Sequence, residues 1–382
     1  MKKFDVAIIG GGAIGTSIAF ELSSQKLRVA VFDRQQPGQE ASWAAAGMLS
    51  PAPDSLRDHP LVPLGNESLK LYPDFAARVE EASGRVVGYA RDGAIEVFLD
   101  PDVQGERDRR VSECRRLGVA AEPVSLTEAR RREQLIGPSA RAACWLPEEG
   151  TVEPRSLMAA LLEAARRAGA EIHASCAVTG LIRDRDRCTG LVAGGEKVAA
   201  DFVVVAAGCF SGEMTGELGA LAQYAPTRPV RGQMLALRPE GYNLRHVLRS
   251  DRANLVPRKD GRIVVGSTSE EAGFDKRVTP AGLCKILSGA LEMCPGLAGA
   301  EVIETWCGLR PGTPDDLPVL GPTDLQGLIV ATGHYRNGIL LAPVTAKLVR
   351  EWIVDGGTEF DARAFSPLRF SQREIKSMSR GN

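Results

Sequence analysis

The residues that most constrain the fold are three glycines that follow a short apolar run near the start of the chain. Residues 4–9 (Phe-Asp-Val-Ala-Ile-Ile) have the composition of a buried strand, and residues 10–15 (Gly-Gly-Gly-Ala-Ile-Gly) open an amphipathic helix. A second strand is predicted at residues 27–32, and Asp33 follows 18 positions after Gly15. A strand, a G-x-G-x-x-G turn, a helix, a strand and an acid in this order predict a dinucleotide-binding unit.

Each residue of this unit has a chemical reason to be there. Gly10 allows a tight turn, Gly12 lets the backbone approach a pyrophosphate, and Gly15 lets the helix pack closely on the strand. The helix N-terminus offers unpaired N–H groups to the phosphates. Asp33 is expected to accept hydrogen bonds from ribose hydroxyls. The predicted cofactor contacts of this unit are Gly10, Gly12, Ala13, Ile14, Gly15, Asp33 and Arg34.

The composition is that of an ordinary soluble protein with room for two domains. The chain has 382 residues, of which 44% are hydrophobic and 25% charged. Its net charge of −1 gives no field that would attract nucleic acid or an anionic membrane. No apolar run approaches the ~20 residues that a membrane span needs. The first nine residues could be mistaken for a short signal peptide, but the fold needs them as a strand. We therefore expect a cytoplasmic protein.

The cysteine and histidine patterns are also typical of a cytoplasmic protein without a bound metal. The eight cysteines are scattered without any C-x-x-C pair, which suits reduced thiols better than a disulfide framework. The four histidines are not spaced with cysteines or carboxylates as metal ligands are. No bound metal is expected.

The remaining pattern predicts an α/β protein (α+β overall) in which a Rossmann-like domain is interleaved with a domain built on an antiparallel sheet. Helices are expected at residues 154–168, 281–293 and 339–354, and β-rich stretches at 177–193, 202–208, 227–237, 253–267 and 328–332. The dinucleotide-binding domain is assigned to residues 1–85, 150–222 and 305–365, the substrate domain to 86–149 and 223–304, and a C-terminal tail to 366–382.

Three further motifs suggest what the site does. Residues 42–48 (Ser-Trp-Ala-Ala-Ala-Gly-Met) contain a run of small residues at 44–47, which would let the backbone lie flat against a ring, although the run would also suit a tightly packed helix start. Residues 308–315 (Gly-Leu-Arg-Pro-Gly-Thr-Pro-Asp) contain Arg310. Residues 333–343 (Gly-His-Tyr-Arg-Asn-Gly-Ile-Leu-Leu-Ala-Pro) form a glycine-bracketed loop after a strand, where open α/β sheets bind ligands. A helix beginning at Ile339 would direct its dipole toward that ligand.

Through these motifs nearly the whole chain resembles the FAD-dependent D-amino-acid oxidase family, and within it the glycine oxidases of thiamine biosynthesis. The resemblance implies FAD as cofactor, oxidation of a small amino acid or amine, dioxygen as electron acceptor and a homo-oligomer. It also implies further cofactor contacts at Ala41, Ser42, Ala46, Gly47, Met48, Val178, Gly208, His334, Tyr335, Arg336, Asn337, Gly338, Ile339 and Leu340.

The resemblance implies that Arg310 and Arg336 bind the substrate carboxylate, for which an arginine fork is suited by its parallel hydrogen bonds. Without the resemblance, the sequence favours a surface ion pair for either arginine, since the chain has many arginines. One position departs from the glycine oxidase pattern: Asn254 stands where a tyrosine helps to hold the carboxylate. We therefore predict a wider pocket, in which Tyr242 or Tyr335 could compensate.

Cys307 raises the question of a covalent flavin, because some sarcosine oxidases attach their flavin through a cysteine in this region. Aligned on residues 313–315, Cys307 lies one place from the required position. We therefore expect FAD to be bound non-covalently.

Other functions remain open from the sequence. The chain could be an FAD-dependent D-amino-acid or secondary-amine dehydrogenase that reduces a quinone, or a flavin-bound protein without catalytic activity. An NAD(P)-dependent reductase, with Arg34 receiving a 2′-phosphate, is less consistent with the sequence because no second glycine fingerprint is present.

Overall fold

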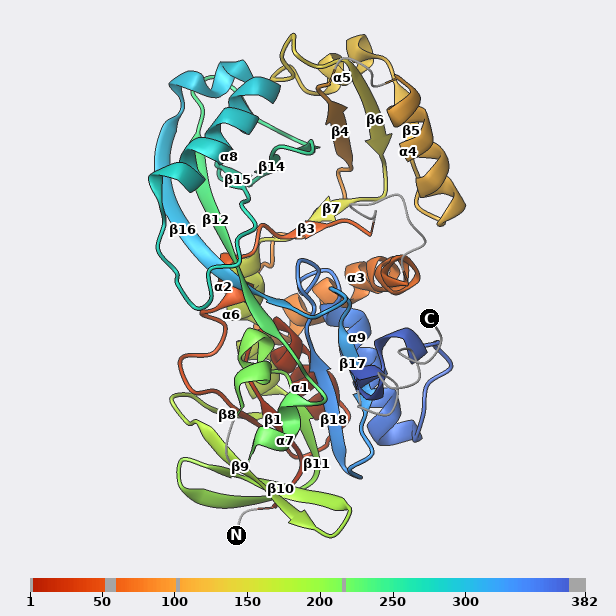
Figure 1. Cartoon of the computed structure of the whole chain (residues 1–382), viewed down its shortest axis with the longest axis vertical. Helices are drawn as coiled ribbons and strands as arrows, with labels where there is room; N and C mark the ends of the chain where they lie inside the picture. Colours follow the sequence, from red (N-terminus) through yellow and green to blue (C-terminus); the bar gives the residue numbers. More distant parts are fainter. Residues whose placement is uncertain (1–2, 52–59, 101–103, 215–217, 371–382) are drawn as a thin grey trace, which may run out of the picture.

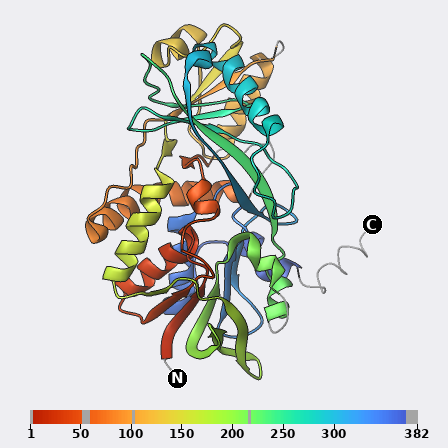
Figure 2. The same cartoon turned by 90° about the vertical axis from the view of Figure 1, so that its left-hand side faces the viewer.

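The computed structural model describes residues 3–51, 60–100, 104–214 and 218–370. Two sheets, each of eight strands, lie at opposite ends of the molecule, with helices between and around them (Figure 1). The chain crosses between the two halves several times, so each half is assembled from distant segments (Figure 2). This is the mixed α/β architecture expected from the sequence.

The first sheet is mainly parallel and contains the predicted dinucleotide unit. Its strand order is β17-β18-β11-β1-β2-β8, and β10 and β9 continue antiparallel from β11. Its central strands are buried on both faces, which explains their continuous apolar runs. The strand bounds are β1 Lys3–Ile9, β2 Val29–Phe32, β8 Glu171–His173, β9 Val178–Asp184, β10 Arg187–Ala193, β11 Glu196–Val205, β17 Val319–Pro322 and β18 Leu328–Thr332.

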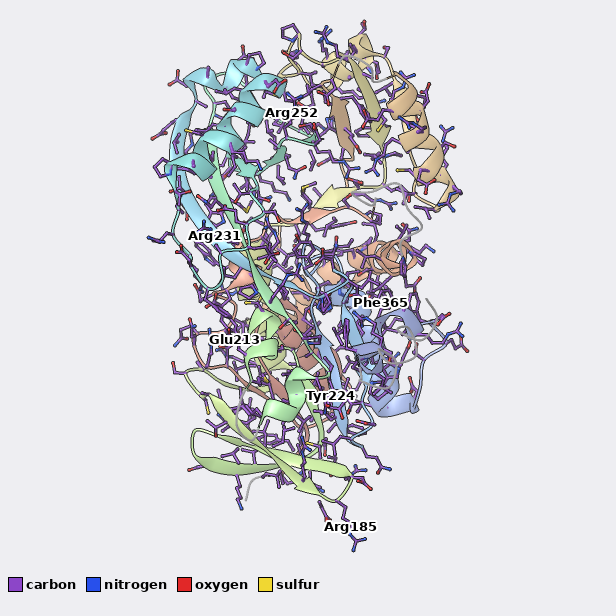
Figure 3. All side chains as sticks on the ribbon, in the orientation of Figure 1. Arg185, Glu213, Tyr224, Arg231, Arg252 and Phe365 are labelled. Atoms are coloured by element: carbon purple, nitrogen blue, oxygen red, sulfur yellow. The ribbon has the colours of Figure 1, made fainter. Side chains whose placement is uncertain are left out.

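Four helices pack together against one face of this sheet, namely α1 Ala13–Ser24, α3 Leu61–Ser83, α6 Pro154–Arg167 and α9 Ala342–Arg350. α6 begins where the sequence predicts, because Pro154 occupies its first turn and the Glu153 side chain accepts a hydrogen bond from Ser156 N at 2.8 Å. α3 has 23 residues and was not predicted, since Pro73 lies inside it. The side chain of Phe365, labelled in Figure 3, is buried in this layer.

The second sheet has the order β16-β12-β15-β14-β13-β4-β6-β5, and all its strand pairs except β13–β4 are antiparallel. One face packs on α8 Pro280–Met293 and α5 Leu126–Arg132, and the other faces the first half of the molecule. The strand bounds are β4 Ala94–Phe98, β5 Glu122–Val124, β6 Ala142–Leu146, β12 Arg228–Arg238, β13 Val247–Arg249, β14 Asn254–Pro257, β15 Ile263–Gly266 and β16 Glu301–Gly312.

The two halves are joined by short elements and by one long strand. α2 Ala41–Ala44 and the small ribbon of β3 Met48–Leu49 with β7 Gly150–Thr151 lie between them, and α4 Gln104–Arg116 covers β6 and β5. β16 pairs with β12 along its whole length, so the domain boundary placed at residue 305 falls inside this strand. Of the predicted tail, residues 371–382 lie outside the described part.

Candidate active site

A cavity of about 880 Å³ lies where the two halves meet. It is lined by the glycine turn after β1, the end of β2, residues 38–51, the start of α3, the start of β9, the segment after β11, parts of β12, β13, β14, β15 and β16, and the loop after β18. All the predicted cofactor and substrate contacts line this cavity except Gly15, and the alternatives Tyr242 and Cys307 do not line it. Distant segments of the chain thus converge on a single site.

The glycine turn has the shape that a pyrophosphate requires. Gly10 has φ of +103°, and a Cβ there would lie 2.5 Å from the Ala206 carbonyl oxygen. Gly12 caps α1 without a side chain, and Ser42 Oγ accepts a hydrogen bond from Ala13 N at 2.9 Å. A Cβ on Gly15 would lie 2.0 Å from the Gly10 carbonyl oxygen. Gly15 therefore shapes the turn by close packing and does not line the cavity.

Asp33 and Arg34 lie at the end of β2, beside this turn. Asp33 Oδ2 accepts a hydrogen bond from Gly11 N at 2.8 Å, and its Oδ1 accepts one from Gln35 N at 2.9 Å. The carboxylate thus fixes the turn while it lines the cavity. The Arg34 guanidinium lies 3.4 Å from the centroid of the Phe210 ring, against which Phe274 also stacks. These two side chains fit the adenosine end of a dinucleotide.

The small residues of α2 form part of the wall between the two halves. A Cβ on Gly308 of β16 would lie 2.5 Å from Ala44 Cβ, so the two segments touch without room for a side chain. Trp306 Nε1 donates a hydrogen bond to the Ala44 carbonyl oxygen at 3.0 Å. Residues 44–48 therefore form a thin wall of the cavity, which fits a flat ring. They follow the four-residue helix α2, so a short, closely packed helix is present in this segment, while contact with a flavin ring stays a prediction.

The loop after β18 is held by a buried histidine. His334 Nε2 and Thr345 Oγ1 lie 3.0 Å apart, and burial lowers the pKa of His334 to about 3, so the ring is neutral. The predicted helix start at Ile339 was wrong, because α9 begins at Ala342 after a turn in which Leu341 N donates to the Asn337 carbonyl oxygen at 2.8 Å. Pro343 stabilises the true first turn, where a proline is tolerated.

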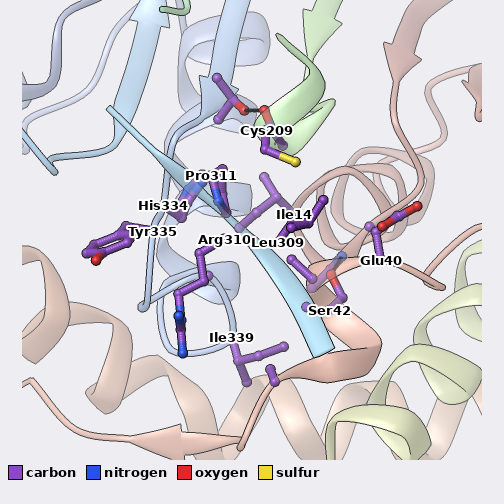
Figure 4. A pocket seen from close by; sticks show the side chains of 18 of the residues that line it. Ile14, Glu40, Ser42, Cys209, Leu309, Arg310, Pro311, His334, Tyr335 and Ile339 are labelled. Carbon is purple, nitrogen blue, oxygen red and sulfur yellow. Dashed lines mark hydrogen bonds between the residues drawn. The ribbon is translucent and has the colours of Figure 1, made fainter. Parts of the chain in front are cut away.

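Arg310 projects from β16 into the cavity, on the side of Ile339 (Figure 4). Its Nη1 donates to the Thr268 carbonyl oxygen at 3.0 Å, and its Nη2 donates to Ser267 Oγ at 2.5 Å. A Cβ on Gly232 of β12 would lie 2.4 Å from both terminal nitrogens, so the guanidinium lies directly over a glycine. Sequence reasoning missed Gly232 and Ser267, whose contacts come from neighbouring strands.

The segment that holds Arg310 is itself fixed by charged groups. Arg231 of β12, labelled in Figure 3, bonds Glu270 Oε2 through Nη2 at 2.5 Å and Asp275 Oδ2 through Nη1 at 2.9 Å. Gln233 Nε2 donates to Glu270 Oε1 at 2.8 Å. These bonds tie residues 267–275 to β12 and so fix the groups that Arg310 contacts.

Arg336 and Asn254 line the cavity from opposite halves of the molecule. Arg336 is exposed and lies 5.3 Å from the centroid of the Tyr335 ring. Tyr335 also lines the cavity, with its hydroxyl 3.2 Å from Ser269 Oγ. Tyr242 is 48% exposed and does not line the cavity, so of the two tyrosines considered only Tyr335 is placed to replace the missing ring.

Cys307 immediately precedes Gly308, the first residue of β16 that lines the cavity. Its opposite residue in the sheet is Gln233, and Cys307 does not line the cavity.

Acid precipitation of the protein is therefore expected to release all FAD into the supernatant and leave a colourless pellet, as absorbance and mass spectrometry would show. A yellow pellet, absent in the Cys307→Ala variant, would establish a covalent link instead.

The wall of small residues and the loop at residues 333–340 fit a second ring system beyond the adenosine site. Together with the glycine turn and Arg310, they define the class of flavin-dependent oxidoreductases. Comparison with known proteins agrees. The sequence profile described as "FAD dependent oxidoreductase" (DAO) matches residues 5–352, and the chain belongs to this family. It is an FAD-dependent oxidoreductase, and its sequence is similar to those of glycine oxidases.

Two relatives and one solved structure illustrate the similarity. Glycine oxidase of Geobacillus kaustophilus is 35% identical over 371 residues, covering 96% of this chain and 97% of the relative. A crystal structure of glycine oxidase from that organism superposes with a TM-score of 0.89 at 34% identity, covering 96% of this chain and 98% of that one. The bifunctional protein ThiO/ThiG of Trichormus variabilis is 35% identical, and although 97% of this chain is aligned, the chain spans about half (55%) of that relative.

Two further observations concern the described residues. None of their helices is both long and apolar enough to cross a membrane. Within the same ranges, no three His, Cys, Asp or Glu side chains are grouped as metal ligands would be.

Proposed function

We propose that the protein oxidises glycine or another small amino acid or secondary amine, such as sarcosine or a small D-amino acid. The products would be the imine or 2-oxo acid, ammonia and hydrogen peroxide. Bound FAD supplies the hydride acceptor at flavin N5, and dioxygen would reoxidise it. The observation that carries the proposal is Arg310, a cation directed into a cavity whose other end has the dinucleotide fingerprint.

The residues of the chain would bind and orient the substrate. Arg310 would receive the carboxylate in two charge-assisted hydrogen bonds, which fix the direction of the α-carbon. Arg336 would approach the same carboxylate from the loop after β18. Asn254 would donate one hydrogen bond from β14, and because it is shorter than tyrosine we expect the pocket to admit amines larger than glycine. His334, buried and paired with Thr345, would hold the loop in place and would not act on the substrate.

Anaerobic titration of the purified holoenzyme tests this proposal. We expect glycine, sarcosine, D-alanine or D-proline to bleach the flavin absorbance, and oxygen then to restore it with about one peroxide per turnover. Bleaching that a quinone reverses and oxygen does not would identify a dehydrogenase. A flavin that no amine reduces would contradict the proposal and indicate a non-catalytic flavoprotein.

The setting of the enzyme is part of the same proposal. We infer from the relatives a cytoplasmic homo-oligomer that serves thiamine biosynthesis. All eight cysteines are free, and five of them are buried, which is consistent with a reducing compartment.

A further inference from the structure

A buried group of four charged side chains adjoins the substrate end of the cavity. Arg249 of β13 bonds Glu96 of β4 through Nη2 at 2.6 Å and Glu149 through Nη1 at 3.0 Å. Arg110 of α4 completes the group with Nε 3.1 Å from Glu96 Oε1. The register places Arg249 between Asn254 on one side and Glu96 on the other. The charge group therefore adjoins Asn254, a predicted substrate contact.

Ser50 connects this group to the cavity. Its hydroxyl donates to Glu149 Oε1 at 2.6 Å and accepts from Arg249 Nη1 at 2.7 Å. Ser50 lines the cavity, whereas Glu149 is only 2% exposed and lies behind it. A hydroxyl has one proton to donate and two lone pairs. With the proton directed to Glu149 and one lone pair used by Arg249, Ser50 keeps one acceptor position.

We propose that Ser50 and Glu149 remove the proton from the substrate ammonium group before hydride transfer. The ammonium N–H proton passes to Ser50 Oγ while the Ser50 hydroxyl proton passes to Glu149 Oε1. The amine becomes neutral, Ser50 remains a neutral hydroxyl, and Glu149 becomes a carboxylic acid. The inference rests on the proposed amine oxidation, because only a neutral amine has the lone pair that assists loss of hydride from the α-carbon.

The surroundings of Glu149 suit a proton acceptor. Burial raises the pKa of Glu149, and the nearby Arg249 opposes that rise. Glu96 differs, because its two contacts with Arg249 and Arg110 outweigh its burial and lower its pKa. Burial also raises the pKa of the neighbouring thiols, that of Cys144 to about 12, so they stay protonated. Of the two acids in the group, Glu149 is therefore the one whose surroundings favour taking up a proton.

The pH dependence of flavin reduction tests the relay. In the wild-type holoenzyme, kcat/KM for glycine is expected to change little between about pH 7 and pH 9, because the enzyme itself deprotonates the zwitterion. In Ser50→Ala only the small fraction of free substrate whose amine is already neutral can react. Its kcat/KM should therefore rise about tenfold per pH unit and lie on the order of a hundredfold below the wild-type value at pH 7. Glu149→Gln should show the same slope.

Matched variants separate the relay from a structural role. Ser50→Thr keeps the hydroxyl and should restore the flat profile. Glu96→Gln removes a buried acid of the same charge group that does not contact Ser50, and should also stay flat. FAD content and the affinity for glycolate, which has the carboxylate without the amine, should be unchanged in Ser50→Ala. Equal slopes in wild type and Ser50→Ala would overturn the relay while leaving amine oxidation intact; wild-type flavin that no amine reduces would instead overturn the proposed function.

Discussion

Arg310→Ala is expected to lower kcat/KM for amino-acid substrates by about a hundred- to a thousandfold, while FAD stays bound. The guanidinium is held over Gly232 by Ser267 and Thr268, so it is already oriented when a carboxylate arrives. Losing a buried, hydrogen-bonded charge partner typically costs 2–5 kcal/mol, roughly this range of rate. Steady-state kinetics together with the flavin spectrum of the variant would measure it.

Two comparisons make that result specific. Arg310→Lys keeps the charge but not the planar fork, so it should recover part of the loss, chiefly in KM. Simple amines without a carboxylate should react equally with wild type and Arg310→Ala. If Arg310→Ala retains both FAD and wild-type kcat/KM for glycine, Arg310 does not bind the substrate.

Gly15→Ala is expected to abolish FAD binding and yield a colourless, destabilised protein. A Cβ at this position would lie 2.0 Å from the Gly10 carbonyl oxygen, a backbone atom that cannot move without displacing the phosphate-binding turn. Flavin content after purification and the midpoint of thermal unfolding would report the loss.

Gly105→Ala is the matched control for this substitution. Gly105 lies in α4, and an added Cβ would meet nothing within 4 Å. Alanine favours a helix over glycine, so this variant should bind FAD normally and unfold at an equal or slightly higher temperature. A yellow, stable Gly15→Ala protein would show that the turn can relax around a methyl group.

The sequence predicts the fold class and most of the cavity because their signals are local. The glycine turn, Asp33 and the loop at residues 333–340 are each contained in a few consecutive residues. The start of α9 was misplaced because the apolar pattern of its helix extends back to Ile339 through a hydrogen-bonded turn that precedes the regular helix. Local pattern alone does not distinguish that turn from the helix.

The groups that the sequence could not indicate are joined across long separations. Ser50 and Glu149 are 99 positions apart, and Ser50 and Arg249 are 199 apart. A lone serine after a strand, or a glutamate near a turn, has no spacing that marks it as functional. Ser50, Glu149 and Arg249 come together only when β13 pairs with β4 and β14 in the second sheet.

The interleaving of the two halves also bears on how the protein acquires its cofactor during synthesis. β1 pairs with β11, whose partner β18 begins at residue 328, and the loop that completes the cavity lies beyond it. A ribosome must therefore deliver almost the entire described chain before the binding site exists. FAD capture is accordingly expected only after residue 340 has been synthesised. The nascent chain depends on late, long-range strand pairing, which slows folding.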